Sequence, residues 1–81
     1  MNDQQLTLQA LSMDLLRVAL GRHRGQAAMA DKFTVEAKKR LSEIDEFDLS
    51  PKIMASLNSK AERSAEDLLM YSTLVRNRST I

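Results

Sequence analysis

The chain contains no cysteine and only one histidine among its 81 residues. The lack of cysteine excludes disulfides and zinc sites built on thiolates, and one histidine cannot form a histidine-rich metal site. Small domains usually supplement a limited core with disulfides, a structural metal or association with another chain. Since the first two routes are closed, we expect no metal or cofactor, and self-association or unusually good helix packing remains.

Glycine, proline and aromatic residues are also scarce, with two glycines, one proline, two phenylalanines, one tyrosine and no tryptophan. The abundant residues are instead strong helix formers such as alanine, leucine, methionine, glutamine, lysine and glutamate. This composition predicts an all-α fold, and the length predicts one domain over residues 1–81. A core of this size supplies only about 3–5 kcal/mol of net stability, so extra burial would be valuable.

No apolar run is long enough to cross a membrane. The densest apolar stretch, residues 10–20, is short and contains Asp14 and Arg17. Residues 1–5 are polar and lack the basic and apolar regions of a secretory signal. These features predict a soluble chain that resides in the cytoplasm.

The first predicted helix covers residues 3–20. Asn2 is a candidate N-cap, and Gln5 lies three residues later, as in a capping box. Gly21 follows the last apolar residue, as a C′ glycine would, and Gly25 is a second break point. The alternative is one kinked helix that runs through both glycines, which would make the chain a two-helix hairpin.

The second predicted helix covers residues 27–46 and ends before Asp48. Asp31 and Thr34 are both plausible N-caps, so the start of this helix is the least defined boundary. Apolar residues recur at steps of three and four, as on one face of a helix. This stripe comprises Ala30, Phe33, Ala37, Leu41 and Ile44.

The third predicted helix is long and covers residues 51–76. Ser50 is a good N-cap, and Pro51 occupies the first helical position, where its missing N–H is not needed. Leu49 and Met54 have the spacing of a hydrophobic staple. A coiled-coil-like seam then follows an unbroken 3-4 step through Met54, Leu57, Ala61, Ser64, Leu68, Tyr71 and Val75. The sequence therefore predicts an antiparallel three-helix domain with a long C-terminal helix.

The first helix carries more apolar surface than one buried stripe requires. One sector holds Leu8, Leu11, Leu15, Val18 and Ala19, and a second, roughly opposite sector holds Leu6, Met13, Leu16 and Leu20. The two other helices could cover one sector each. The alternative is that the second sector packs on a partner, as in the core-like interfaces of obligate oligomers.

We adopt the second alternative as a functional prediction. The predicted interface consists of Leu6, Met13, Leu16 and Leu20, with Ala61 and Ala65 as small residues that permit close helix approach. The predicted partner is a second copy, which would complete a larger helical bundle, or another helical protein. The predicted role is that of a non-catalytic adaptor, chaperone or regulatory subunit.

A basic segment supports an alternative role in nucleic-acid binding. Its candidate anion contacts are Arg22, Arg24, Lys38, Lys39 and Arg40. However, the net charge is only +1, and no aromatic residue is interleaved with these positions for base stacking.

The sequence offers little for catalysis. His23 lies between Arg22 and Arg24, and no carboxylate within four residues is placed to orient it. The acidic residues Asp45, Glu46 and Asp48 lack the glycine-punctuated spacing of a calcium loop. We therefore expect neither an enzyme nor a small-molecule substrate.

Overall fold

The computed structural model describes residues 3–80, and its regular structure is entirely helical. Its helices are α1 (Asp3–His23), α2 (Ala27–Ser42), α3 (Ser50–Asn58) and α4 (Arg63–Ser79). No strand occurs within this described range. The all-α prediction is therefore confirmed, whereas residues 3–80 form four helices where the sequence predicts three.

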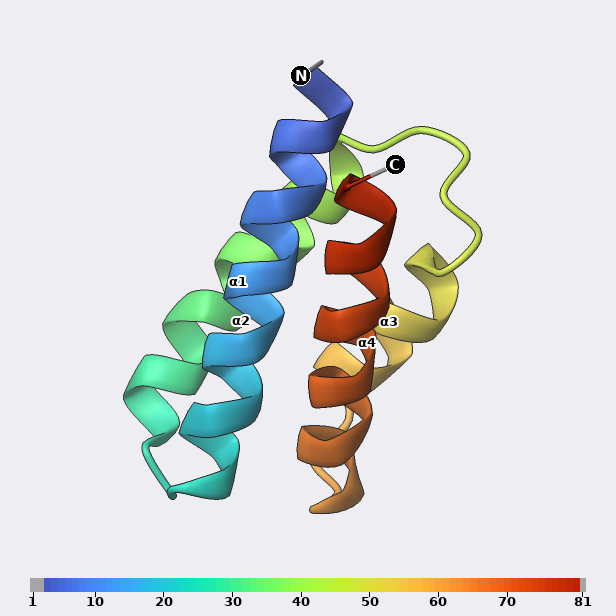
Figure 1. Ribbon diagram of the computed structural model, residues 1–81. Coiled ribbons are helices and arrows are strands. Elements are labelled where there is room, and N and C mark those ends of the chain that lie inside the picture. The colour runs from blue at the N-terminus through green and yellow to red at the C-terminus, as the bar shows by residue number, and fades with distance from the viewer. Residues whose placement is uncertain (1–2, 81) are drawn as a thin grey trace.

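The four helices form a ring in which each helix packs against two others. α1 contacts α2 and α4, and α3 completes the ring by contacting the same two helices. Successive helices run in opposite directions, so α1 and α4 lie side by side and antiparallel (Figure 1). The chain thus closes a small up-and-down bundle, measuring 35 × 19 × 19 Å, without help from a second chain.

The additional helix arises because the segment 51–76 is not one helix. It bends at residues 59–62, which we call the α3–α4 bend, and α4 then runs back along α3. Ser59 adopts an extended backbone, with φ −74° and ψ 141°, and this conformation ends α3. The Ser59 hydroxyl accepts a hydrogen bond from the Ala61 N–H at 3.2 Å, within the bend.

The core combines the inward sector of α1 with the stripe of α2. Both predicted sets are buried or nearly so, with Phe33 only half-buried. The buried set comprises Leu8, Leu11, Leu15, Val18, Ala19, Ala30, Ala37, Leu41, Ile44, Ile53, Leu57, Leu68 and Val75. Within residues 3–80, no helix combines the length and the apolar character that a membrane span needs.

The two glycines have different roles from those predicted. α1 continues to His23, so Gly21 lies inside the helix and is not its C′ residue. A Cβ at Gly21 would lie 3.1 Å from the backbone nitrogen of Ala30, so this glycine permits close packing of α1 on α2. Gly25 has φ +72° and makes the turn. Because α1 and α2 are separate antiparallel helices, the kinked two-helix hairpin does not form.

The ends of α2 also differ from the prediction. Gln26 occupies the N-cap position, and Asp31 and Thr34 lie within the helix, so neither of them caps it. Thr34 instead donates its hydroxyl hydrogen bond to the carbonyl of Ala30 at 2.7 Å. The helix ends at Ser42 and not at residue 46. The predicted cap Asn2 lies outside the described residues.

The start of α3 lies close to the predicted position, but the capping chemistry differs. α3 begins at Ser50, and Leu49 occupies the N-cap position. The hydroxyl of Ser50 is buried and has no hydrogen-bond partner within residues 3–80. Pro51 lies in the first turn as predicted, and Leu49 and Met54 both pack against the core.

Replacing Ser50 with alanine is therefore expected to leave the free energy of unfolding unchanged or slightly higher. A true N-cap serine would lose about 1 kcal/mol on the same change. Here the hydroxyl caps nothing, and its removal relieves the burial of a polar group. Urea denaturation of the two proteins measures the difference, and a loss of about 1 kcal/mol would restore Ser50 as the cap.

Candidate interaction surface

The second apolar sector of α1 lies on the outside of the bundle. Leu6 is 52% exposed and Met13 is 46% exposed, whereas Leu16 and Leu20 are half-buried. We call these four residues the outer face of α1. The ring of helices buries the opposite sector and leaves Leu6 and Met13 in contact with solvent.

The outer face has the spacing of a helix–helix seam. Leu6, Gln9, Met13, Leu16 and Leu20 follow one another at steps of three, four, three and four residues. This is the heptad spacing at which two helices pack side by side. Gln9 is the single polar member of the seam.

The two small residues predicted to belong to the interface lie on elements other than α1. Ala61 is exposed in the α3–α4 bend, and Ala65 is half-buried on α4. Serines provide the buried small positions of α4, and Ser72 donates its hydroxyl to the carbonyl of Leu69 at 2.7 Å. Such bonds within a helix let a serine be buried without a partner on another helix.

Four other large apolar residues are exposed. Val35 on α2 is 65% exposed, and Leu69, Met70 and Leu74 on α4 are each exposed by 40% or more. Val35 is isolated on its helix, which makes it a useful reference for the outer face of α1. A single exposed apolar residue such as Val35 is ordinary on a protein surface, whereas Met70 and Leu74 lie one helical turn apart on α4.

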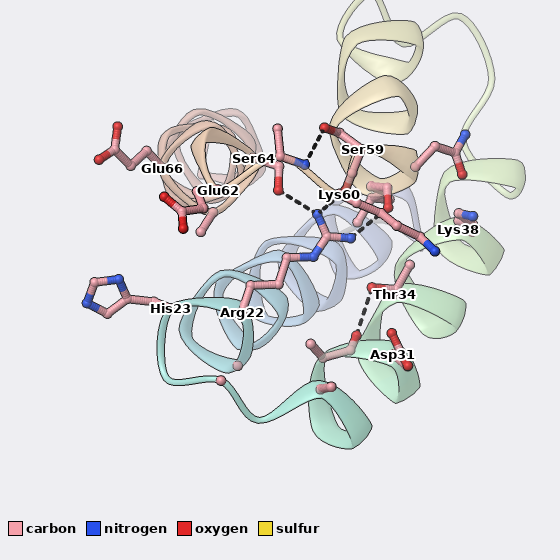
Figure 2. A pocket seen from close by; sticks show the side chains of 18 residues that line it. Arg22, His23, Asp31, Thr34, Lys38, Ser59, Lys60, Glu62, Ser64 and Glu66 are labelled. Atoms are coloured by element: carbon pink, nitrogen blue, oxygen red, sulfur yellow. Dashed lines mark hydrogen bonds between the residues drawn. The ribbon is translucent and has the colours of Figure 1, made fainter.

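Arg22 is partly buried, and its guanidinium caps the end of α3 (Figure 2). Its Nη1 donates to the carbonyls of Ser56 and Ser59, both at 3.0 Å, and to the hydroxyl of Ser64 at 2.8 Å. Its Nη2 donates to the carbonyl of Leu57 at 2.6 Å. The guanidinium therefore joins the C-terminus of α1 to both sides of the α3–α4 bend.

Burial of the Arg22 guanidinium lowers its pKa below the ordinary arginine value, and the nearby charge of Asp31 opposes this effect. Arginine remains protonated despite such a shift, because its ordinary pKa is far above neutral. The cation is thus committed to an internal capping role that sequence spacing alone does not reveal.

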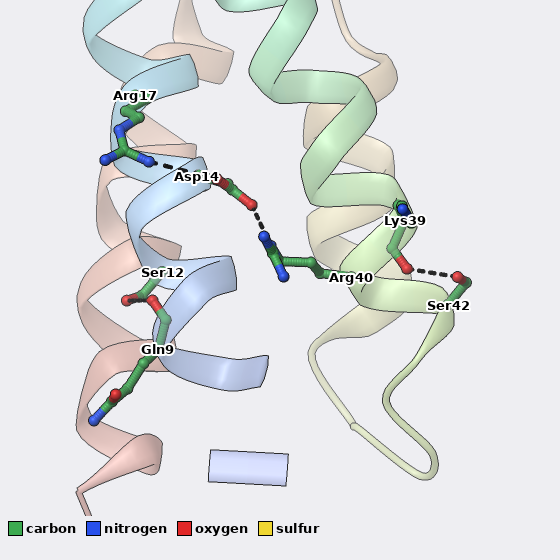
Figure 3. A network of polar contacts seen from close by, with 7 residues as sticks. All are labelled: Gln9, Ser12, Asp14, Arg17, Lys39, Arg40 and Ser42. Carbon is green, nitrogen blue, oxygen red and sulfur yellow. Dashed lines mark hydrogen bonds and ion pairs between the residues drawn. The ribbon is translucent and has the colours of Figure 1, made fainter. Parts of the chain in front are cut away.

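Arg40 is likewise engaged within the bundle, where it pairs with a buried carboxylate (Figure 3). Its Nε donates to Oδ2 of Asp14 at 2.7 Å, and the Asp14 side chain is only 6% exposed. Arg17 lies 3.8 Å from the other carboxylate oxygen and covers the ring of Phe33. The ion pair between Asp14 and Arg40 therefore joins α1 to α2.

The five predicted anion contacts have three different surroundings in the structure. The side chains of Arg22 and Arg40 are occupied by internal partners, whereas Arg24 and Lys39 are exposed. Lys38 lines a cleft between the α1–α2 turn and the α3–α4 bend. Arg22 also lines this cleft, but its guanidinium is already bound to groups around the α3–α4 bend.

That cleft has a volume of about 920 Å³ and carries charges of both signs. Its charged lining consists of Arg22, Asp31, Lys38, Lys60, Glu62 and Glu66, and His23 lies at the same cleft. His23 points away from Arg22 on the side of Glu62 and Glu66 (Figure 2). Within residues 3–80, no three side chains of the metal-binding kinds are grouped closely enough to hold an ion.

Comparisons of the chain with protein-family models, with curated proteins and with solved structures find no match.

Proposed function

We propose that this chain is a non-catalytic interaction module that binds a second copy of itself through the outer face of α1. In this arrangement Leu6, Met13, Leu16 and Leu20 pack against the same residues of the partner. Association buries apolar surface that the isolated chain leaves in water, and this burial supplies the driving force.

The half exposure of Leu6 and Met13 is the observation that carries the proposal. The four-helix ring is closed, so neither residue is needed to complete the core of the single chain. Both residues belong to a heptad seam, which distinguishes them from Val35. A small domain also gains more from additional burial than a large one does.

The charges at the two ends of α1 favour an antiparallel arrangement of the partners. Asp3 is exposed in the first turn, and Arg24 is exposed directly after the last turn. A two-fold axis near Met13 brings the acidic end of one α1 beside the basic end of the other. The helix dipoles are also opposed in this arrangement, whereas a parallel pair would place like charges together.

Replacing Met13 with glutamate tests the proposal, and Val35→Glu is the matched control. Each change places one charge on an exposed apolar position of a helix, but only the first lies on the proposed interface. We expect Met13→Glu to weaken dimerisation about 30-fold or more, because burying a charged side chain at each half of the interface costs at least about 2 kcal/mol.

Sedimentation equilibrium over micromolar concentrations measures the effect. The wild type and Val35→Glu should form dimers with similar affinity, and Met13→Glu should remain a folded monomer. Equal affinity for the two variants would contradict the proposed surface. A wild-type chain that stays a monomer would contradict self-association and would make another helical protein the partner to seek.

A further inference from the structure

The hydrogen bonds of Arg22 replace those of a continuous helix. In an uninterrupted helix the carbonyl of each residue accepts from the N–H four residues later. The carbonyls of Ser56, Leu57 and Ser59 would thus accept from residues 60, 61 and 63. The α3–α4 bend removes this geometry, and the Arg22 guanidinium donates to the same three carbonyls instead (Figure 2).

The bend itself is built from residues that also suit a helix. Residues 59–62 contain neither glycine nor proline, and Lys60, Ala61 and Glu62 are good helix formers. The apolar seam of α3 continues into α4 without a change of phase, through Leu57, Ala61 and Ser64. The local sequence is therefore compatible with both a bent and a straight α3–α4 segment.

We infer that the α3–α4 bend is a hinge held closed by Arg22, and that its opening lets two copies of the chain exchange α4. In the straight form, α4 leaves its own α1 and exposes Leu68 and Val75, which are fully buried in the ring. A second opened copy presents the complementary vacated surface on its own α1. Exchange remakes every contact between α1 and α4, as in other domain-swapped dimers.

This dimer is independent of the proposed function, because it uses the inner side of α1 and not its outer face. The two forms of association can be separated by working in the Met13→Glu background. Outer-face pairing is blocked there, and any remaining dimer must form in another way.

Distance measurement between two spin labels tests the inference directly. The chain has no cysteine, so Lys52→Cys on α3 and Met70→Cys on α4 place labels at two exposed sites. In the bent form the labelled helices are neighbours, with axes about 10 Å apart. In a straight helix the two sites, 18 positions apart, would be separated by about 27 Å along the axis. Dilution with unlabelled chain restricts the measurement to pairs within one chain.

Arg22→Met should shift most of the population from the short distance to about 27 Å and should produce a dimer at tens of micromolar. Lys60→Pro should reverse both effects when it is added to Arg22→Met. Proline cannot continue a helix, and it favours an extended residue before it, which is the conformation that Ser59 has in the bend.

An Arg22→Met chain that is folded and keeps the short distance would overturn the inference, whether it is a monomer or a dimer. If that variant loses its helical circular dichroism, Ser59→Ala provides the second test. It removes the hydroxyl that accepts from the Ala61 N–H while leaving Arg22 in place. The same shift toward the long distance is expected at high concentration, and a short distance at every concentration would overturn the inference.

Discussion

Replacing Arg40 with methionine should lower the free energy of unfolding by about 3 kcal/mol. The change leaves the carboxylate of Asp14 buried without its 2.7 Å partner, and breaking a buried pair in this way typically costs 3–5 kcal/mol. The expected value lies at the lower end because Arg17 lies 3.8 Å from the same carboxylate. Urea denaturation measures the loss as a lower midpoint with an unchanged slope.

Replacing Asp14 instead of Arg40 tests whether the loss comes from the buried, unpaired carboxylate or only from the missing contact. Asp14→Asn leaves Arg40 unpaired, but that side chain is 35% exposed and can be hydrated. We therefore expect Asp14→Asn to cost no more than about 1 kcal/mol. The double variant Arg40→Met/Asp14→Leu should recover most of the stability lost in Arg40→Met. Equal losses from the two single changes would contradict the burial of Asp14 as the cause.

Arg22→Met should also destabilise the bent chain by about 3 kcal/mol. It removes four hydrogen bonds and leaves the carbonyls of Leu57 and Ser59 without the donor that Arg22 supplies, whereas the carbonyl of Ser56 still accepts from the Ser59 N–H. Bonds to a charged donor contribute more than neutral ones, although the guanidinium is only partly buried. The free energy of unfolding should be measured with Lys60→Pro also present. Proline prevents the α3–α4 segment from straightening, so a change of conformation cannot compensate for the lost hydrogen bonds.

Arg24→Met provides the matched control for Arg22→Met. Arg24 is the same residue type two positions later, and it is exposed. We expect its replacement to change the free energy of unfolding by less than about 0.5 kcal/mol. Similar losses at positions 22 and 24 would show that the capping contacts of Arg22 do not stabilise the bend.

Sequence periodicity was sufficient to predict the buried surfaces of the first two helices. The stripe of α2 and the inward sector of α1 both follow from steps of three and four residues, because each helix buries one face against its neighbours. The outward position of Leu6 and Met13 agrees with the second sector identified on α1. Their role as an interface remains a prediction.

The bend at residues 59–62 could not be predicted from the same periodicity, because the seam continues through it. One local signal was available, since Ser59 and Glu62 have the serine–glutamate spacing of a capping box. The other determinant is Arg22, which lies 34 residues or more from the groups it binds. Contacts over such separations do not appear in helical spacing.

The anion-binding role predicted for Arg22 and Arg40 also overlooked contacts between residues far apart in the sequence. Both residues belong to a basic segment whose composition is typical of an anion-binding surface. In the folded chain each of them pairs with groups on another helix, one with carbonyls and the other with a buried carboxylate. Charge patterns along a sequence do not distinguish solvated cations from those that hold helices together.

The methyl resonance of Met13 provides the most direct test of the outer face of α1 as the site of self-association. Met13 and Met70 are nearly equally exposed, at 46% and 49%, on two different helices. In a concentration series with methyl-labelled methionine, the Met13 signal should shift with dimer formation, whereas the Met70 signal should not. A Met13 signal that is constant from micromolar to millimolar concentration, or a shift confined to Met70, would contradict the proposed function.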